Sequence, residues 1–92
     1  MPVLSSETLA AELTTLPGWS VESGQVTKKF KAPSFHRAIG FVTQIAILAD
    51  KADHHPDIDI RYDTVTIALS THSEGGITEK DIAMAREIES AL

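Results

Sequence analysis

The stretch Asp57-Ile-Asp-Ile-Arg-Tyr-Asp-Thr-Val-Thr-Ile-Ala-Leu-Ser70 decides the fold of this 92-residue chain. Apolar side chains occupy every second position in two runs, 57–62 and 64–70. A period of two is typical of antiparallel strands with one face against a core and one in water. We therefore expect a hairpin in which Tyr62 packs on the inward face. Asp57, Asp59 and Arg61 should form a solvated or cross-strand charged face.

Upstream of this hairpin the sequence predicts a helix and a second hairpin. The helix should span Ser6 to Leu16, with Ser5 as its N-cap and Pro17-Gly18 as its end. Strands are expected at 19–22 and 25–31, joined by Ser23-Gly24 as a two-residue turn.

The segment between the two hairpins predicts a long helix that begins after Ser34 and ends at about Ala52. Its apolar positions cover a wide arc, and a helix of this kind is usually buried on two sides. In so small a domain the second side is available for a subunit interface, so we expect a homo-oligomer, either a dimer or a tetramer. The first face comprises Phe35, Ala38, Ile39, Val42, Ala46 and Ala49, and the second comprises Phe41, Ile45 and Leu48.

The last helix is expected from Glu79 to Ala91, because Thr78 suits an N-cap and Asp81 stands at the third helical position. The element order is then α-β-β-α-β-β-α. A single α+β domain over residues 1–92 follows: a two-layer sandwich whose four-stranded antiparallel sheet carries three helices on one face.

Composition excludes several function classes. The formal net charge of −5 argues against non-specific nucleic-acid binding, and Lys28, Lys29 and Lys31 form only a small basic cluster that we expect to be solvated. There is no cysteine, so thiolate chemistry is excluded. No apolar run has membrane-spanning length and no signal peptide is recognisable, so a cytoplasmic location is the default expectation.

Histidines mark the candidate site. His54, His55 and His72 lie in the second half of the chain, and histidine is the side chain suited to proton transfer near neutral pH. His36 stands apart and is expected to be solvated. Asp81 has two readings: a helix-capping carboxylate, or a carboxylate that orients an imidazole and fixes its tautomer.

The spacing of these residues resembles the signature of the pterin-4a-carbinolamine dehydratase family. The segments HHPDIDIRY, STH and GGITEKD look like those of bacterial members, and the likeness covers nearly the whole chain. The signature reads His54-His55-Pro56, five residues, Tyr62, nine residues, His72, eight residues and Asp81, with the acidic Asp50 four residues before it.

The resemblance implies the same sandwich fold and a reaction without metal or organic cofactor. Water would be lost from a 4a-hydroxytetrahydropterin, which recycles the pterin used by an aromatic amino acid hydroxylase. It implies His54 and His72 as the acid/base pair and His55 as a catalytic and substrate-holding residue, with Asp81 also at the substrate. Asp63 departs from the asparagine of many relatives.

Two other functions compete with this reading. Three imidazoles could bind zinc, although His54 and His55 are adjacent rather than three or four residues apart, and no cysteine supports them. Alternatively, the chain is a non-catalytic interaction protein that uses its two-sided helix, as animal members of the family use their subunit interface to assist a transcription factor.

Overall fold

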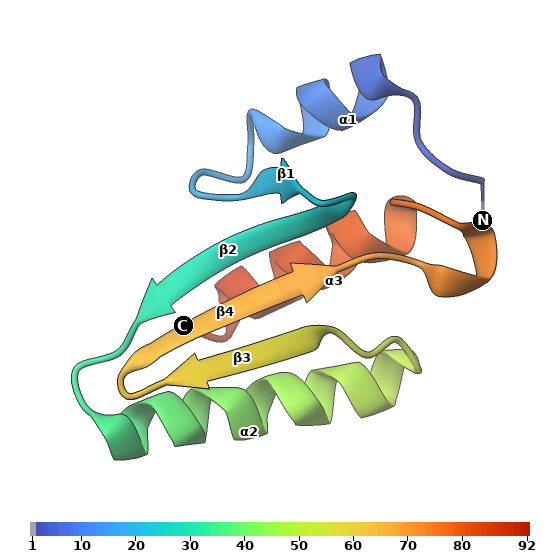
Figure 1. Ribbon diagram of the computed structural model, residues 1–92. Helices are drawn as coiled ribbons and strands as arrows, with labels where there is room; N and C mark the ends of the chain where they lie inside the picture. Colours follow the sequence, from blue (N-terminus) through green and yellow to red (C-terminus); the bar gives the residue numbers. More distant parts are fainter. Residues whose placement is uncertain (1) are drawn as a thin grey trace.

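A computed structural model describes residues 2–92 and confirms the α-β-β-α-β-β-α order, with one additional 3₁₀ turn (Figure 1). No helix in this range is long and apolar enough to cross a membrane. The elements are α1 (Ser6–Leu13), β1 (Ser20–Glu22), β2 (Gln25–Lys31), α2 (Phe35–Ala52), β3 (Asp57–Arg61), β4 (Thr64–Leu69), the 3₁₀ turn η1 (His72–Glu74) and α3 (Glu79–Ser90).

The four strands form one antiparallel sheet in the order β1-β2-β4-β3. Its register places Phe30 of β2 opposite Val65 of β4, which in turn lies opposite Ile60 of β3. Because side chains alternate along each strand, these residues share one face, and the next register row places Lys31, Thr64 and Arg61 on the other. The sheet therefore has an apolar face for the helices and an open polar face.

The core lies between the apolar face of the sheet and helices α2 and α3. Helix α1 lies on the same side, joined to α3 by an ion pair from Arg86 to Glu12. The two-layer arrangement predicted from the sequence is confirmed. The core consists of Leu16, Trp19, Val26, Phe30, Ala38, Ile45, Val65, Ile67, Leu69, Ile77, Ile82, Met84, Ala85 and Ile88.

Helix α1 is one turn shorter than expected. It ends at Leu13, and the hydroxyls of Thr14 and Thr15 donate to the carbonyls of Ala11 and Glu12. Threonine hydroxyls compete with the helical hydrogen-bond ladder, and proline at position 17 disfavours helix in the residue before it. Leu16 is still buried, but it belongs to the turn that follows the helix.

The prediction that Tyr62 lies in a strand and faces inward is wrong. Tyr62 lies outside β3 in the turn to β4, with a φ of 55°, and 73% of its surface is exposed. A two-residue hairpin turn requires positive φ and takes its first residue out of the strand alternation. The Ser23-Gly24 turn, predicted correctly, also begins with a residue at positive φ, Ser23 at 52°. Asp59 and Arg61 are solvated and pair with each other, as expected.

Helix α2 has the predicted bounds, but its apolar residues divide differently. Ala38, Ile45 and Ala49 form the buried stripe, which mixes members of the two predicted faces. Phe35, Ile39 and Ile47 are 51%, 40% and 55% exposed. An unpartnered apolar stripe therefore runs along the outside of α2.

The basic cluster on β2 is also not uniformly solvated. Lys28 points toward the helices, where its ammonium pairs with the carboxylate of Glu89 and lies 4.8 Å from the centre of the Phe30 ring. The indole nitrogen of Trp19 donates to the same Glu89 carboxylate, at 2.8 Å. Alternation places Lys28 inward between two outward-facing residues, and its pairing with Glu89 joins the sheet to α3.

Candidate functional site: two histidine–aspartate pairs at one end of the sheet

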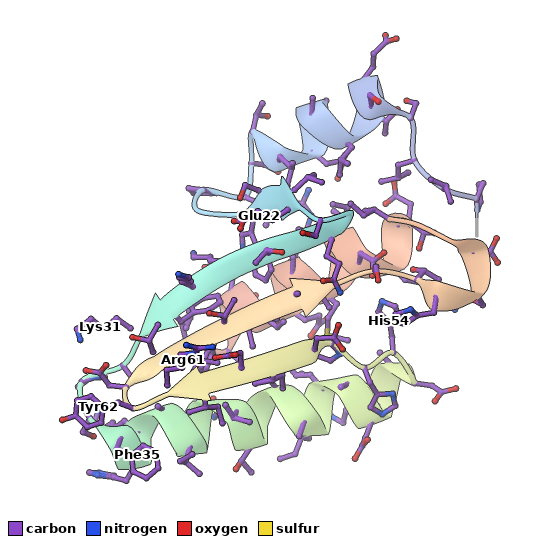
Figure 2. The ribbon with its side chains drawn as sticks, in the orientation of Figure 1. Glu22, Lys31, Phe35, His54, Arg61 and Tyr62 are labelled. Carbon is purple, nitrogen blue, oxygen red and sulfur yellow. The ribbon has the colours of Figure 1, made fainter. Side chains whose placement is uncertain are left out.

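His54 lies at the end of the molecule where α2 finishes and β3 begins (Figure 2). The helix is closed by Asp53, whose φ of 50° is left-handed, and the backbone N–H of His54 donates to the carbonyl of Ala49. A left-handed residue at a helix end redirects the chain sharply. The two residues that follow, His54 and His55, consequently reach different surroundings.

His54 is held by a buried carboxylate. Its Nε2 lies 2.6 Å from Oδ1 of Asp81, and the two side chains are 11% and 0% exposed. These residues are 27 positions apart, so tertiary folding brings them together. The predicted association of Asp81 with an imidazole is therefore present in the structure.

Asp81 also caps helix α3, which confirms its structural reading. Its Oδ2 accepts from the backbone N–H of Thr78 and from the hydroxyl of Thr71, each at 2.9 Å. The Thr71 and Thr78 hydroxyls lie 2.8 Å apart. Asp81 is therefore enclosed by these partners and by His54.

His55 forms a second pair of a different kind. Its Nε2 lies 3.0 Å from Oδ1 of Asp50 on the last turns of α2, and the side chains are 59% and 80% exposed. The acidic residue four positions before His54 therefore pairs with His55 across the solvated surface. His55 is open to a ligand, whereas most of His54 is enclosed.

His72 begins the 3₁₀ turn η1 and is exposed. It follows Thr71, whose hydroxyl donates to Asp81, the carboxylate that pairs with His54. His72 borders a surface depression between the β1–β2 turn and the loop after β4. That depression is lined by Ser23, Gly24, Gln25, Ser70, Thr71, His72, Gly75 and Gly76.

Tyr62 of the signature and the separate His36 lie outside this site. Tyr62 is at the opposite end of the sheet, near Phe35 (Figure 2). His36 is exposed on the first turn of α2, where Nδ1 lies 3.3 Å from the hydroxyl of Ser34. A larger depression beside His36 runs along Phe41 and Gln44 toward the end of α3 and contains none of the other histidines.

The metal-site alternative finds no support in the geometry. Within residues 2–92, no three histidine, aspartate or glutamate side chains are grouped so that they could hold a metal ion. Each imidazole pair instead consists of one ring and one carboxylate.

Thr71 is the residue of this network that the sequence did not indicate by itself, although it lies in the STH segment that resembles the family.

Fold and site together define a small α+β protein with a histidine–carboxylate pair buried at one end of an antiparallel sheet. The family model described as pterin 4 alpha carbinolamine dehydratase matches residues 2–91. The chain therefore belongs to the pterin-4a-carbinolamine dehydratase family.

Individual relatives agree with this assignment. Two bacterial proteins carry the provisional name pterin-4-alpha-carbinolamine dehydratase: one from Chloroflexus aurantiacus is 48% identical, and one from Mycolicibacterium smegmatis is 50% identical. Each match covers 100% of this chain, with 99% and 98% of the relative respectively.

Solved structures show the same fold. A crystal structure from Brucella melitensis, described as a transcriptional coactivator/pterin dehydratase, matches with a TM-score of 0.91 and 40% identity over 97% of both chains. A pterin dehydratase-like RuBisCO assembly factor of the alpha-carboxysome matches with a TM-score of 0.64 over 79% of this chain and 84% of that one. At 22% identity, the latter similarity concerns the fold alone.

Proposed function

We propose that this protein removes water from a 4a-hydroxytetrahydropterin and gives the quinonoid dihydropterin. The observation that carries the proposal is the His54–Asp81 pair, a largely enclosed imidazole held by a fully buried carboxylate. Such an imidazole is oriented before a ligand arrives, which general acid–base catalysis requires. Membership of the family supplies the substrate class.

The chemistry needs proton transfer and no electron sink. The bond between C4a and its hydroxyl oxygen breaks while the N5 lone pair forms a double bond to C4a. Hydroxide is a poor leaving group, so a proton delivered to it allows water to depart, and N5 then loses its own proton. We assign these transfers to His54 and His72, each typically worth about 10²–10⁴-fold in rate.

We assign a different role to the exposed His55. Its ring is accessible and is paired only with the solvated Asp50, so it can turn toward a bound pterin. Hydrogen bonding to the substrate is the contribution that this position suits best. Nothing in the proposed reaction requires a metal or an organic cofactor.

The rate of carbinolamine decay tests this function. Freshly generated 4a-hydroxytetrahydropterin should lose its absorbance faster with the protein than without it in a stopped-flow instrument. His72→Ala should reduce this acceleration, whereas His36→Ala, a matched exposed histidine outside the site, should leave it unchanged. No acceleration by the folded wild-type protein would reject the dehydratase and favour the non-catalytic interaction protein.

We also propose that the protein self-associates through the outer stripe of α2. Phe35, Ile39 and Ile47 follow one another along this helix, and Ile60 of the edge strand β3 is also exposed, at 38%. An apolar stripe beside an unpaired strand edge is a surface that a second copy can bury. A self-complementary contact of this kind is the commonest origin of homodimers.

Light scattering of purified variants tests the assembly. Ile47→Lys should lower the molar mass toward that of the 9.9 kDa monomer. Val21→Lys is the control, because Val21 is a similarly exposed aliphatic residue, at 45%, on the strand β1 at the other sheet edge. An unchanged mass for Ile47→Lys, or a monomeric wild type, would reject the interface.

A further inference from the structure

Thr71 has a hydroxyl that the proposed proton transfers do not use directly, yet it is 3% exposed and lies inside the site. It donates to Oδ2 of Asp81 and lies beside the hydroxyl of Thr78. Its carbonyl accepts the backbone N–H groups of Glu74, Gly75 and Gly76, and its own N–H donates to the carbonyl of Gly76. Thr71 is therefore fixed through both its backbone and its side chain.

The direction of each hydrogen bond in this network follows from counting donors. An ionised carboxylate only accepts, so the Thr71 hydroxyl proton points at Asp81. The Thr78 hydroxyl must then donate to the Thr71 oxygen, while its own oxygen accepts from the backbone N–H of Lys80. No buried side-chain nitrogen or oxygen in the described part of the chain is left without a partner.

The same count determines which nitrogen of His54 carries a proton in the neutral ring. Oδ2 of Asp81 is occupied by Thr71 and the Thr78 backbone, which aims Oδ1 at Nε2 of His54. Since Oδ1 can only accept, Nε2 holds the hydrogen. Nδ1 is then the nitrogen with a free lone pair, and it alone can take a proton from a ligand.

We propose that Thr71 is a positioning residue that holds Asp81 in the orientation in which its Oδ1 binds His54 as the Nε2–H tautomer, so that Nδ1 is the atom that exchanges the proton. The proposal rests on the dehydratase function for its catalytic consequence, but the tautomer itself does not depend on the reaction. Thr71 acts through Asp81 and does not touch the ring. Because His72 is its neighbour in the chain, the same residue also anchors the second candidate acid/base group.

Nitrogen NMR of the ¹⁵N-labelled imidazoles tests the tautomer directly. In the wild-type protein, His54 should show a protonated Nε2 and an unprotonated Nδ1 at a pH where the ring is neutral. Thr71→Val keeps the side-chain shape but removes one of the two donors that hold Oδ2 of Asp81, so the carboxylate should be less fixed and the hydrogen bond from Nε2–H of His54 to Oδ1 should weaken, with a smaller downfield shift of the Nε2 proton. Thr71→Ser should restore the wild-type shift. An unchanged His54 spectrum in folded Thr71→Val would overturn the proposal.

Kinetics provide the second readout. Loss of one hydrogen bond of ordinary net strength should lower kcat about tenfold in Thr71→Val, with little change in KM. Thr66→Val is the matched control, because Thr66 lies on β4, the strand that precedes Thr71, with its side chain on the open polar face. Equal losses in the two variants, or a loss that Thr71→Ser does not rescue, would also overturn the positioning role.

Asp81→Asn keeps the proposal testable if Thr71→Val fails to fold. The amide oxygen can still accept from Thr71 and Thr78, so its NH₂ group faces His54 and must donate to Nε2. His54 should then switch to the Nδ1–H tautomer, and retention of Nε2–H would reject the assigned hydrogen-bond directions. The NMR result is independent of activity, so failure of the dehydratase function is distinguishable from failure of the tautomer assignment.

Discussion

The two histidine–aspartate pairs of this protein are neighbours in sequence and opposites in environment. His54 and Asp81 are 2.6 Å apart with side chains 11% and 0% exposed, whereas His55 and Asp50 are 3.0 Å apart with side chains 59% and 80% exposed. Similar distances therefore describe two unlike interactions. Burial and the other partners of each carboxylate determine how firmly its imidazole is held.

The physical origin of the difference is the chain reversal at Asp53. The left-handed residue ends α2, so His54 reaches the capping box of α3 while His55 reaches back to Asp50 on its own helix. In the first pair the carboxylate is already fixed by a helix cap. In the second, water competes with both partners, and such pairs contribute little free energy.

The largest expected effect is on catalysis, and it should separate the two histidines. His54→Gln should lower kcat by about 10²–10⁴-fold, because it removes a general acid or base that is already oriented. His55→Gln should mainly raise KM, because glutamine retains hydrogen-bonding groups at a position assigned to holding the substrate. Steady-state kinetics of both variants with 4a-hydroxytetrahydropterin provide the measurement.

Circular dichroism spectra of both variants serve as the control for folding. Equal losses of kcat in the two variants would contradict the different roles of His54 and His55, since the buried and exposed rings would then contribute alike. A greater loss in His55→Gln would reverse the assignment.

The next largest effect is on stability, and it should separate the two carboxylates. Asp81→Ala removes a helix cap and leaves the buried Thr71 hydroxyl and Thr78 N–H without their acceptor. The expected loss in the free energy of unfolding is about 2–4 kcal/mol. Asp50→Ala should change it by less than about 1 kcal/mol, as for other exposed pairs. Urea denaturation of each variant measures the difference.

A high-salt series sharpens this stability comparison. Salt screens exposed charges far more than buried ones, so only the small Asp50 contribution should shrink as ionic strength rises. A comparable salt dependence for Asp81→Ala would indicate that the His54 pair is more solvated than the structure shows.

Much of the fold could be predicted because its signals are local. Alternation on 64–69 identified β4, and the capping residues Ser34 and Thr78 identified the starts of α2 and α3. Tyr62 was placed wrongly, because the alternation continues one residue beyond the strand into a turn whose positive φ leaves no mark in the hydrophobic pattern. The division of α2 into buried and exposed stripes depends on the angle at which the helix meets the sheet.

The sequence indicated which residues form the candidate site but not which of them are hydrogen-bonded to each other. Spacing and family likeness indicated His54, His55, His72 and Asp81, yet only the folded chain shows which carboxylate meets which ring. The Thr71 hydroxyl could not be found from pattern, because threonine is ordinary after a strand that already contains two threonines, and its hydrogen bond spans ten residues to a helix cap. The direction of each hydrogen bond can be assigned only when all the partners of both groups are known, and these come from the structure.

The smallest expected effect concerns Asp63, a third carboxylate at the opposite end of the sheet from Asp81. The hydrogen bond from the Lys31 ammonium, at 2.7 Å, is the main cause that holds the Asp63 pKa below its ordinary value of 3.8. A carboxyl whose pKa is lower in the folded state stabilises the protein above its unfolded pKa, and this contribution is lost as pH falls through the folded pKa.

Asp63→Asn should therefore be slightly less stable than the wild type near pH 7, and the difference should vanish in acid below pH 3.8. Urea midpoints of both proteins across this pH range test the sign, and a difference that grows in acid would contradict it. Because Asp63 lies far from His54, dehydration activity per folded molecule should be the same in both.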